Sequence, residues 1–337
     1  MSYETVIGLE IHVELLTEHK AFCRCKNVFG DAPNSNKCPI CEGLPGAIPV
    51  FNREVLDVAT KAGLILNCEI NDMSGFDRKN YFYPDLPKGF QITQFYKPLC
   101  TNGFLYLPEN EKRINISEIH IEEDASKIVR DGDDILVDYN RCGVPLIEIV
   151  TAPDFRNSSE VIEFLEIIRR SFQYGGISDC RIEQGSMRAD VNLSVRIPGG
   201  ELGTRTETKN MASFKAISRA IEEESKRQIE LIESGVGVIQ ETRRWDENSG
   251  KTIFMRKKEN SHDYKYHIEP DLLPIKVSSE YLLNMRNSIP ELPFEKAKRY
   301  VDIYGLTPYE ANILTSSREL IEFFEKATDT NNLPKDN

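Results

Sequence analysis

The sequence lacks several features that would place a chain in a familiar class at once. No apolar run approaches the roughly 20 residues needed to span a bilayer. The opening MSYETVIGLE has neither the basic nor the apolar region of a signal peptide. The phosphate-binding motifs GxxxxGK[ST] and GxGxxG are missing. We therefore expect a cytoplasmic protein without a membrane segment, in which any ATP site would not use those two glycine-rich loops.

Positive charge is in the minority. Lys and Arg number 42 against 54 Asp and Glu, which gives a formal net charge of −12. Phosphate contacts need clustered cations, so an acidic chain is a poor general nucleic-acid binder. Any RNA binding would be local or supplied by a partner. The length of 337 residues suggests about two domains.

Apolar periodicity predicts three long helices. The segments with helical spacing are residues 52–66, capped by Asn52, residues 158–173, capped by Ser158 or Ser159, and residues 212–233. Two shorter helical patterns, 294–304 and 307–326, follow a change of character at the segment IPELP. We place a domain boundary near residue 292.

Alternating segments between these helices predict strands. In TVIGLEIHVEL, residues 5–15, the apolar residues share one face while Glu10, His12 and Glu14 share the other. RADVNLSVRI, PGGELG and TRTETKN predict a hairpin with Arg205, Glu207 and Lys209 on one face. ETRRWDENSGKTIFMRKKE predicts a second hairpin that turns at residues 248–250. The mixture predicts an α+β fold, an antiparallel sheet with helices gathered on one side.

Four of the eight cysteines are clustered in CRCKNVFGDAPNSNKCPIC, with the spacing C-x-C-x12-C-x2-C. They are Cys23, Cys25, Cys38 and Cys41. Two close pairs of thiolates separated by a loop suit a tetrahedral structural Zn²⁺, which would clip the loop and leave no position open for substrate. The alternatives are unrelated buried thiols or a CxxC redox pair. For Cys68, Cys100, Cys142 and Cys180 we expect small core residues.

Acidic residues recur on several of the predicted strands. Besides Glu10, His12 and Glu14, the candidates are Glu122, Glu123 and Asp124 in HIEEDASK, and Asp190 and Glu207 in the first hairpin. Taken singly, each would be a solvated strand face. Together, paired strands could gather them into a Mg²⁺ site, although a His ligand suits Mn²⁺ better.

The stretch FDRKNYFYPDLPKGFQITQF combines cations with aromatic residues. Its polar and aromatic members are Arg78, Lys79, Tyr81, Tyr83, Lys88, Gln91 and Gln94. Lys or Arg would suit the phosphates of a nucleotide and Tyr its base or ribose. The alternative is a surface loop bounded by prolines.

Several of these segments together resemble one family. ETVIGLEIHVEL, FDRKNYFYPDLPKGFQITQF, VDYNRCGVPLIEIV, GSMRADVNLSVR, ETKN, ETRRWDENSGKT and IPELP resemble the B subunit of the aspartyl/glutamyl-tRNA amidotransferase. The resemblance runs from about residue 3 to about residue 326. DYNRCGVPLIEI is long and unusual in composition, which makes the match specific.

The resemblance implies a cradle-like catalytic domain, distantly similar to that of glutamine synthetase. It implies that ATP and Mg²⁺ serve to phosphorylate the side-chain carboxylate of Glu or Asp misacylated on tRNA(Gln) or tRNA(Asn), and that ammonia then displaces the phosphate. Ammonia would come through a tunnel from an amidase-type glutaminase, the A subunit, and a small C subunit would brace the heterotrimer. No amidase signature rich in glycine and serine occurs here, which agrees with a partner that supplies ammonia.

Matched position by position, Glu10, His12 and Glu123 fall on metal-site positions of the family. Asp190 and Glu207 extend this set from the matching hairpin. Lys79 and Glu123 also match polar positions that line or gate the ammonia route. We expect Lys79, Tyr81, Tyr83, Lys88 and Gln91 to contact the nucleotide. Some family members keep a cysteine zinc site, and this chain resembles those.

The chain also departs from the family. Members usually continue past residue 337 with a helical domain and a tail domain that contact the tRNA body. We therefore expect a catalytic cradle at 1–292, with the zinc loop at 23–41, and the start of a helical domain at 293–337, without the tail. His267-Ile268 stands where members usually have Phe-Pro. Two other interpretations follow: a short paralogue that amidates a carboxylate not carried on tRNA, or a non-catalytic, zinc-stabilised assembly module.

Overall fold

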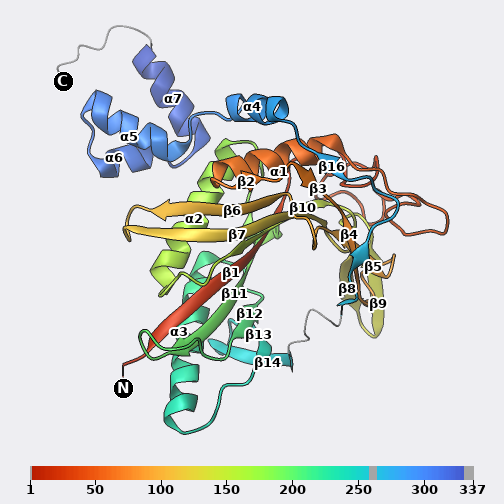
Figure 1. Ribbon diagram of the computed structural model, residues 1–337, viewed down its shortest axis with the longest axis horizontal. Coiled ribbons are helices and arrows are strands. Elements are labelled where there is room, and N and C mark those ends of the chain that lie inside the picture. The colour runs from red at the N-terminus through yellow and green to blue at the C-terminus, as the bar shows by residue number, and fades with distance from the viewer. Residues whose placement is uncertain (1, 258–263, 330–337) are drawn as a thin grey trace.

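A long mixed sheet runs through the computed structural model, which describes residues 2–257 and 264–329 (Figure 1). The sheet has nine strands in the order β14-β13-β12-β11-β1-β10-β7-β6-β2. In chain order their bounds are β1 Glu4–Glu14, β2 Glu69–Ile70, β6 Cys100–Leu107, β7 Lys112–Glu123, β10 Pro145–Thr151, β11 Met187–Arg196, β12 Thr206–Lys209, β13 Glu241–Asp246 and β14 Lys251–Lys257. The first strand of the chain therefore lies at the centre of the sheet.

Both predicted hairpins form, but the prediction of a purely antiparallel sheet is wrong at one place. β11 pairs with β12, and β13 with β14, in antiparallel fashion. β12 and β13 are parallel. Parallel neighbours need a long crossover connection, and helix α3 (Phe214–Glu233) supplies it here. The pairing within each hairpin depends on residues close together in the sequence. The parallel pairing between the two hairpins depends on the crossover through α3.

The three long helices form within a residue or two of the predicted bounds. α1 (Arg53–Ile65) begins after Asn52, whose side chain accepts a hydrogen bond from the Glu54 amide. α2 (Ser158–Tyr174) is capped by Asn157, so the predicted serine cap is wrong. α3 is capped by Ser213. Asn157 and Ser158 are both good caps, and the local backbone selects the first.

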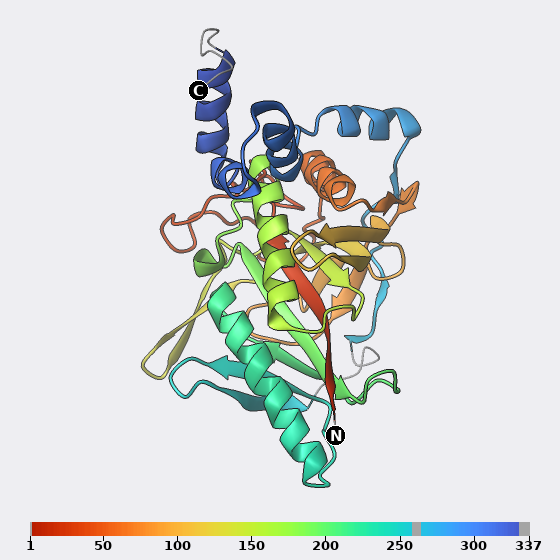
Figure 2. The same ribbon diagram turned by 90° about the vertical axis from the view of Figure 1, so that its left-hand side faces the viewer.

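The main core lies between the sheet and these helices. Ile7, Leu9, Ile11 and Val13 of β1 point into it, as the alternation predicts. Figure 2 shows α2 and α3 lying across one face of the sheet. Close packing of α1 on β6 depends on Gly63, because a Cβ there would lie 2.5 Å from the Cys100 Sγ. The opposite face of the sheet carries the polar side chains of β1.

Smaller elements surround the sheet. They are the three-stranded sheet of β4 Asp77–Asn80, β5 Phe90–Thr93 and β15 His267–Ile268; the pair β3 Met73–Ser74 and β16 Ile275–Lys276; the hairpin β8 Lys127–Asp131 and β9 Asp134–Asp138; and the short helix η1 Ile182–Gln184. Cys68, Cys100 and Cys180 belong to the main core, as expected of small apolar residues.

The last helices of the described chain are α4 Ser279–Asn287, α5 Pro293–Tyr304, α6 Pro308–Leu314 and α7 Arg318–Asp329. Of these, α4 lies beside α1, while α5, α6 and α7 pack on one another (Figure 1). The pattern at 307–326 predicted one helix, but the chain divides there into α6 and α7. Tyr300, Ala297 and Ala311 make a small core of their own. In the described ranges, no helix is long and apolar enough to cross a bilayer.

Candidate active site

The polar face of β1 opens onto a large cavity. The cavity has a volume of about 1780 Å³, and Glu10 and His12 line it. Glu122 of β7, Glu148 of β10 and Glu207 of β12 line it as well. The helices cover the other face of the sheet, so the alternation of each strand turns its acids toward the cavity. Glu10 and His12 on the polar face of TVIGLEIHVEL therefore belong to a cavity that acids of three other strands share.

Strand register brings the first group of acids together. His12 lies opposite Glu148 in the β1–β10 pairing, and Glu148 lies opposite His120 in the β10–β7 pairing. The His12 Nε2 is 3.6 Å from a Glu148 oxygen and 3.8 Å from a Glu122 oxygen. Ligand atoms of His12, Glu122 and Glu148 all lie within 4.8 Å of one another, close enough to hold one metal ion.

The buried imidazole of His120 compensates for the charge of these acids. Its Nε2 lies 3.0 Å from a Glu148 oxygen and 3.3 Å from a Glu122 oxygen. Burial alone would lower the pKa of His120, but the two carboxylates raise it to about 10. Burial likewise opposes the charged form of Glu148, and the two imidazoles of His12 and His120 nevertheless hold its pKa well below the usual range.

A second group of acids lies at the pairing of β1 with β11 and β12. Glu10 stands opposite Asp190 in the register. Ligand oxygens of Glu10, Asp190 and Glu207 lie within 4.8 Å of one another. The Lys209 ammonium makes ion pairs with Asp190 and, at 3.4 Å, with Glu207. These three acids are part of the larger set that the sequence placed in a magnesium site; the structure brings them together, while His12 lies in the other group and Glu123 in neither.

Neutral side chains fix the direction of these carboxylates. The Asn192 amide donates to a Glu10 oxygen at 2.9 Å. The Thr242 hydroxyl donates to a Glu207 oxygen at 2.9 Å. Because each donor sits on a neighbouring strand of the sheet, the acids are held in place without a bound ion.

The candidate nucleotide residues divide into two sets. Lys79, Tyr81 and Tyr83 line the cavity. The Lys79 Nζ lies 5.1 Å from the centre of the Tyr264 ring. Burial opposes the charge on Lys79, yet the nearby carboxylates of Glu122 and Glu148 raise its pKa above the usual value.

Lys88 and Gln91 lie behind the acids and do not line the cavity. Gln91 donates to the Glu122 side chain at 3.2 Å and to the Glu123 carbonyl at 2.7 Å. Lys88 forms an ion pair with Glu123. These contacts support the end of β7, and the nucleotide contacts expected of Lys88 and Gln91 stay a prediction.

The structure places Glu123 apart from both groups of acids. Glu123 accepts a hydrogen bond from the Ile92 amide at 3.0 Å in addition to the ion pair with Lys88. It shares the strand parity of Ile119 and Ile121, which point into the core. Its neighbour Glu122 has the opposite parity and lines the cavity. The part predicted for Glu123 in metal binding and in the ammonia route stays a prediction.

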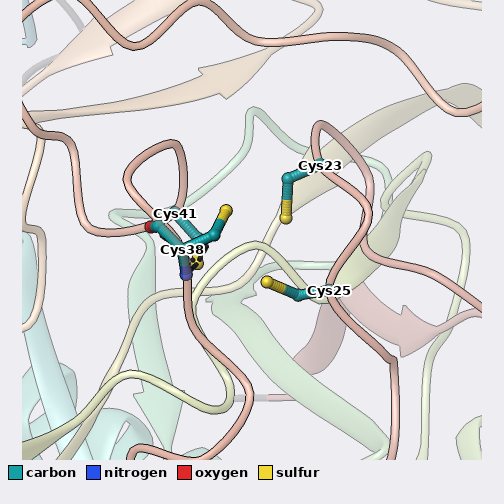
Figure 3. A group of neighbouring side chains, drawn as sticks. All are labelled: Cys23, Cys25, Cys38 and Cys41. Atoms are coloured by element: carbon teal, nitrogen blue, oxygen red, sulfur yellow. Dashed lines mark hydrogen bonds between the residues drawn. The ribbon is translucent and has the colours of Figure 1, made fainter.

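The four clustered cysteines meet in space. The Sγ atoms of Cys23, Cys25, Cys38 and Cys41 all lie within 4.8 Å of one another. Figure 3 shows the sulfurs of Cys23 and Cys25 facing the second pair. Sulfurs bound tetrahedrally at the usual Zn–S distance lie about 3.8 Å apart, and those of Cys38 and Cys41 are 3.9 Å apart. The donor set and its spacing fit zinc.

Cys142 belongs to this region and not to the main core. It packs against Cys23 and Cys41. Its thiol donates to the Cys41 carbonyl at 3.0 Å. The segment that leads into β10, and so to Glu148, is thereby attached to the cysteine cluster. Sequence reasoning gave Cys142 no such position, because it lies 101 residues from Cys41.

Comparison with known proteins agrees with this geometry. Residues 5–283 match the family described as the GatB/GatE catalytic domain. The chain belongs to this family. The match includes every residue of the two acid groups and of the cysteine cluster.

Several curated relatives are named as the B subunit of the aspartyl/glutamyl-tRNA(Asn/Gln) amidotransferase. The protein of Caldicellulosiruptor saccharolyticus is 55% identical over 331 residues, which are 97% of this chain and 69% of the relative. That of Lachnoclostridium phytofermentans is 54% identical over 339 residues, 99% of this chain and 71% of the relative. That of Carboxydothermus hydrogenoformans is 53% identical over 341 residues, with the same shares.

Sequence reasoning missed several residues of this cavity, among them Glu148, a member of an acid group, and His120, which contacts it. Glu148 is a lone acid in the apolar run PLIEIV, and His120 alternates with Ile119 and Ile121. The available signal was the alternation along each strand. A polar residue inside an otherwise apolar, buried strand indicates a site when it lies on the same face of the sheet as other polar residues. The assignment of Glu148 would still have needed the order of the strands.

Proposed function

We propose that the chain is the amide-forming subunit of an ATP-dependent, glutamine-dependent amidotransferase. Its substrate would be the side-chain carboxylate of Glu or Asp carried on tRNA(Gln) or tRNA(Asn). One observation carries the proposal: Glu10 and Glu207 of one acid group, and His12, Glu122 and Glu148 of the other, line the same cavity, with Asp190 directly beside Glu10 and Glu207. The substrate class is supported by the printed name of the relatives.

The reaction would proceed in two displacements. A carboxylate is a poor acceptor for ammonia until one of its oxygens becomes a good leaving group. The substrate carboxylate oxygen attacks the γ-phosphorus of ATP, and ADP leaves. Ammonia then attacks the acyl carbon, phosphate leaves with the electron pair of the broken C–O bond, and the nitrogen gives up one proton to solvent or to the departing phosphate. Mg²⁺ held by the acid groups would neutralise the negative charge that develops on the transferred phosphoryl group.

The donor atoms fit such an ion. Carboxylate oxygens are the ligands that Mg²⁺ prefers, and Glu10, Asp190 and Glu207 supply three of them within 4.8 Å. The His12 imidazole in the other group is a ligand better suited to Mn²⁺. We propose that Lys79 binds phosphate oxygens or guides ammonia, and that Tyr81 and Tyr83 contact the base or ribose. Arg205, Lys209 and Arg256 add positive charge to the cavity wall.

The wider assignments follow the family. We propose that residues 1–292 form a cradle like that of glutamine synthetase and that 293–337 begin a helical domain. An amidase-type glutaminase, the A subunit of the complex, would supply ammonia. A small C subunit would brace the complex, and the acceptor end of the misacylated tRNA would enter the cavity. Zn²⁺ on the four cysteines would clip the loop at 23–41, and a thiolate site of this kind suits the reducing cytoplasm.

An amidation assay tests the function. The chain is incubated with ATP, Mg²⁺, ammonium or the glutaminase partner, and Glu-tRNA(Gln) or Asp-tRNA(Asn). We expect ATP-dependent formation of Gln-tRNA(Gln) or Asn-tRNA(Asn). If ATP is turned over only with a carboxylate that is not carried on tRNA, the result would support the paralogue interpretation. Absence of turnover with the complete set of partners would leave a non-catalytic assembly module.

The variant Glu10→Gln tests the acid groups directly. We expect it to abolish phosphorylation, with at least about a 100-fold loss of ADP formation, because a carboxylate ligand at the transferred phosphoryl group is lost. Thermal stability should be kept, since three carboxylates crowded together repel one another. ADP release and the melting temperature are the two measurements.

Glu14→Gln is the matched control. Glu14 lies on the same face of β1 and is not among the residues that line the cavity. Burial and the carboxylate of Asp124 raise its pKa to about 7. The control should keep its activity. If Glu10→Gln lost thermal stability together with activity, Glu10 would have a structural role instead.

A further inference from the structure

One lysine next to the cysteine cluster has no place in the function described so far. Lys20 is fully buried, with 0% of its surface exposed. Its Nζ lies 2.8 Å from the Asn36 carbonyl oxygen, 3.1 Å from the Tyr139 carbonyl oxygen and 3.8 Å from the Cys41 Sγ. Across the described ranges 2–257 and 264–329, Lys20 makes no ion pair with a carboxylate, and the nearby acids Glu123 and Asp124 pair with Lys88 and Arg141.

The three acceptors match the three hydrogens of a charged lysine. An ammonium group donates three hydrogen bonds and accepts none. A neutral amine would donate only two and leave one of the acceptors unmatched. Two backbone carbonyls and a sulfur around one Nζ therefore fit the charged form.

A buried ammonium also needs a negative charge nearby. Burying an unpaired charge costs several kcal/mol even after the protein relaxes. The carbonyl groups of Asn36 and Tyr139 offer only dipoles, and the Cys41 sulfur is the one acceptor within hydrogen-bond reach among those described that can carry a charge. Divalent zinc with four thiolates carries two net negative charges. The cluster beside Lys20 is thus the partner that the buried cation requires.

We propose that Lys20 is the resident countercation of the cysteine site: its ammonium donates a hydrogen bond to the Cys41 thiolate and offsets one of the two net negative charges of a tetrathiolate zinc centre. This inference rests on the zinc assignment proposed above and not on amide formation. It gives the metal site a fifth residue, which does not touch the metal itself.

The position of Lys20 lets it act on the whole site. Its backbone amide donates to the Cys25 carbonyl at 3.0 Å, next to the first cysteine pair. Its side chain reaches Cys41 of the second pair and Tyr139, which precedes β10. Release of zinc needs a thiolate to leave the metal. A hydrogen bond from a buried cation holds the Cys41 sulfur in place, so Lys20 should slow the release of zinc.

The experiment measures zinc release from the purified, zinc-loaded full chain. Lys20→Met removes the charge and keeps an unbranched apolar stem. We expect about a 10- to 100-fold faster transfer of zinc to a colorimetric chelator, the usual effect of losing a hydrogen-bond partner of a ligand. In the Co²⁺-substituted protein, the thiolate-to-cobalt absorption should move to longer wavelength, because the sulfur electrons lose a stabilising cation.

Lys37→Met is the matched control. Lys37 precedes Cys38 in the same loop, but it is partly exposed and has its own ion pair with Glu42 at 2.5 Å. Because Lys37 makes no hydrogen bond to a cysteine sulfur in the described part of the chain, its loss should change zinc release and the cobalt spectrum much less than Lys20→Met does. Equal release rates for Lys20→Met and the wild-type chain would overturn the proposal. A wild-type chain that holds no zinc would overturn the zinc assignment first, and the two failures are distinguishable by metal analysis.

If Lys20→Met does not fold, the wild-type chain decides the question. With ¹⁵N-labelled lysine, we expect a solvent-protected ammonium signal in the zinc-loaded protein at neutral pH, and its loss when a chelator removes the zinc. A protected amine signal in its place, or an ammonium signal indifferent to zinc, would overturn the proposal.

Discussion

Strand parity separates two neighbouring glutamates that look alike in the sequence. Glu122 lines the cavity beside His12, while Glu123 turns the other way and forms an ion pair with Lys88. One residue of difference moves a side chain to the other face of a sheet. The chemistry proposed for the acid groups therefore depends on Glu122, and Glu123 supports the strand that carries it.

Two variants compare these positions. We expect Glu122→Gln to lower the rate of amide formation at least about 100-fold with little loss of stability. Glu123→Gln leaves Lys88 without its charged partner in a mostly buried position, so it should lower the free energy of unfolding by about 3 kcal/mol. Rates per folded molecule and urea denaturation measure the two effects. A stable but inactive Glu123→Gln protein would return Glu123 to the site, as the family resemblance implies.

At the scale of the elements, α3 is joined to the sheet by a buried polar network and not by apolar packing alone. Glu224 is 0% exposed and accepts hydrogen bonds from Thr206 of β12 at 2.7 Å and from Thr252 of β14 at 2.7 Å. Arg227 pairs with it at 2.6 Å. Thr206 precedes Glu207, so the helix helps to hold the strand that carries a cavity acid.

This network predicts a pH-dependent stability. Burial opposes the charge on Glu224, but its pairing with Arg227 lowers the pKa below the ordinary value of 4.5. A lowered pKa in the folded state gives a stabilisation that is complete above the unfolded-state pKa and lost as the pH falls through the folded-state pKa. Glu224→Gln should cost about 3 kcal/mol at pH 7, with a smaller difference from the wild-type chain below about pH 4.

Denaturant unfolding across pH measures that difference. Glu230→Gln, an exposed position of the same helix with a 3.9 Å ion pair to Lys226, is the control and should change stability by less than about 0.5 kcal/mol. A loss for Glu224→Gln that stays equal to its value at pH 7 as the pH falls well below about 4 would contradict the electrostatic explanation.

At the scale of the whole molecule, the cysteine loop is a peripheral region attached to the connection between β9 and β10. The Asn34 amide donates to Asp138 at 2.9 Å, and the Tyr139 amide donates to the Asn34 side chain at 2.8 Å. The Asn36 amide donates to Asn140 at 2.8 Å. The main core contributes none of these contacts, so the region should respond to metal on its own.

Removal of zinc should therefore loosen one part of the molecule. We expect about one zinc per chain. Chelation, or the double variant Cys38→Ser/Cys41→Ser, should lower the melting temperature and raise hydrogen exchange in residues 20–50 and 127–143. Strands β1, β10 and β11 should keep their protection, because apolar residues of the main core hold them. Hydrogen exchange in residues 20–50 and 127–143 that does not change on chelation would contradict a structural role for zinc. A fully active, equally stable double variant without zinc would contradict it as well.

Much of the local structure was predictable from the sequence. The three long helices, both hairpins, the polar face of β1 and the meeting of the four cysteines follow from short-range patterns. Asp190 and Glu207 were placed correctly beside Glu10, because a hairpin next to an alternating strand carries them. The cap of α2 was not predicted correctly, because Asn157 and the serines after it have similar capping propensities. The break between α6 and α7 was not predicted either, because the apolar spacing continues across it.

The sequence by itself determined which side chains share a face of each element, because alternation and helical spacing are local properties of the chain. Only the tertiary structure decided which faces meet. The crossover through α3 made β12 and β13 parallel, the strand register brought Glu148 and His120 to His12, and folding of distant segments enclosed Lys20 beside Cys41. These outcomes depend on contacts between residues far apart in the chain, which no local pattern encodes.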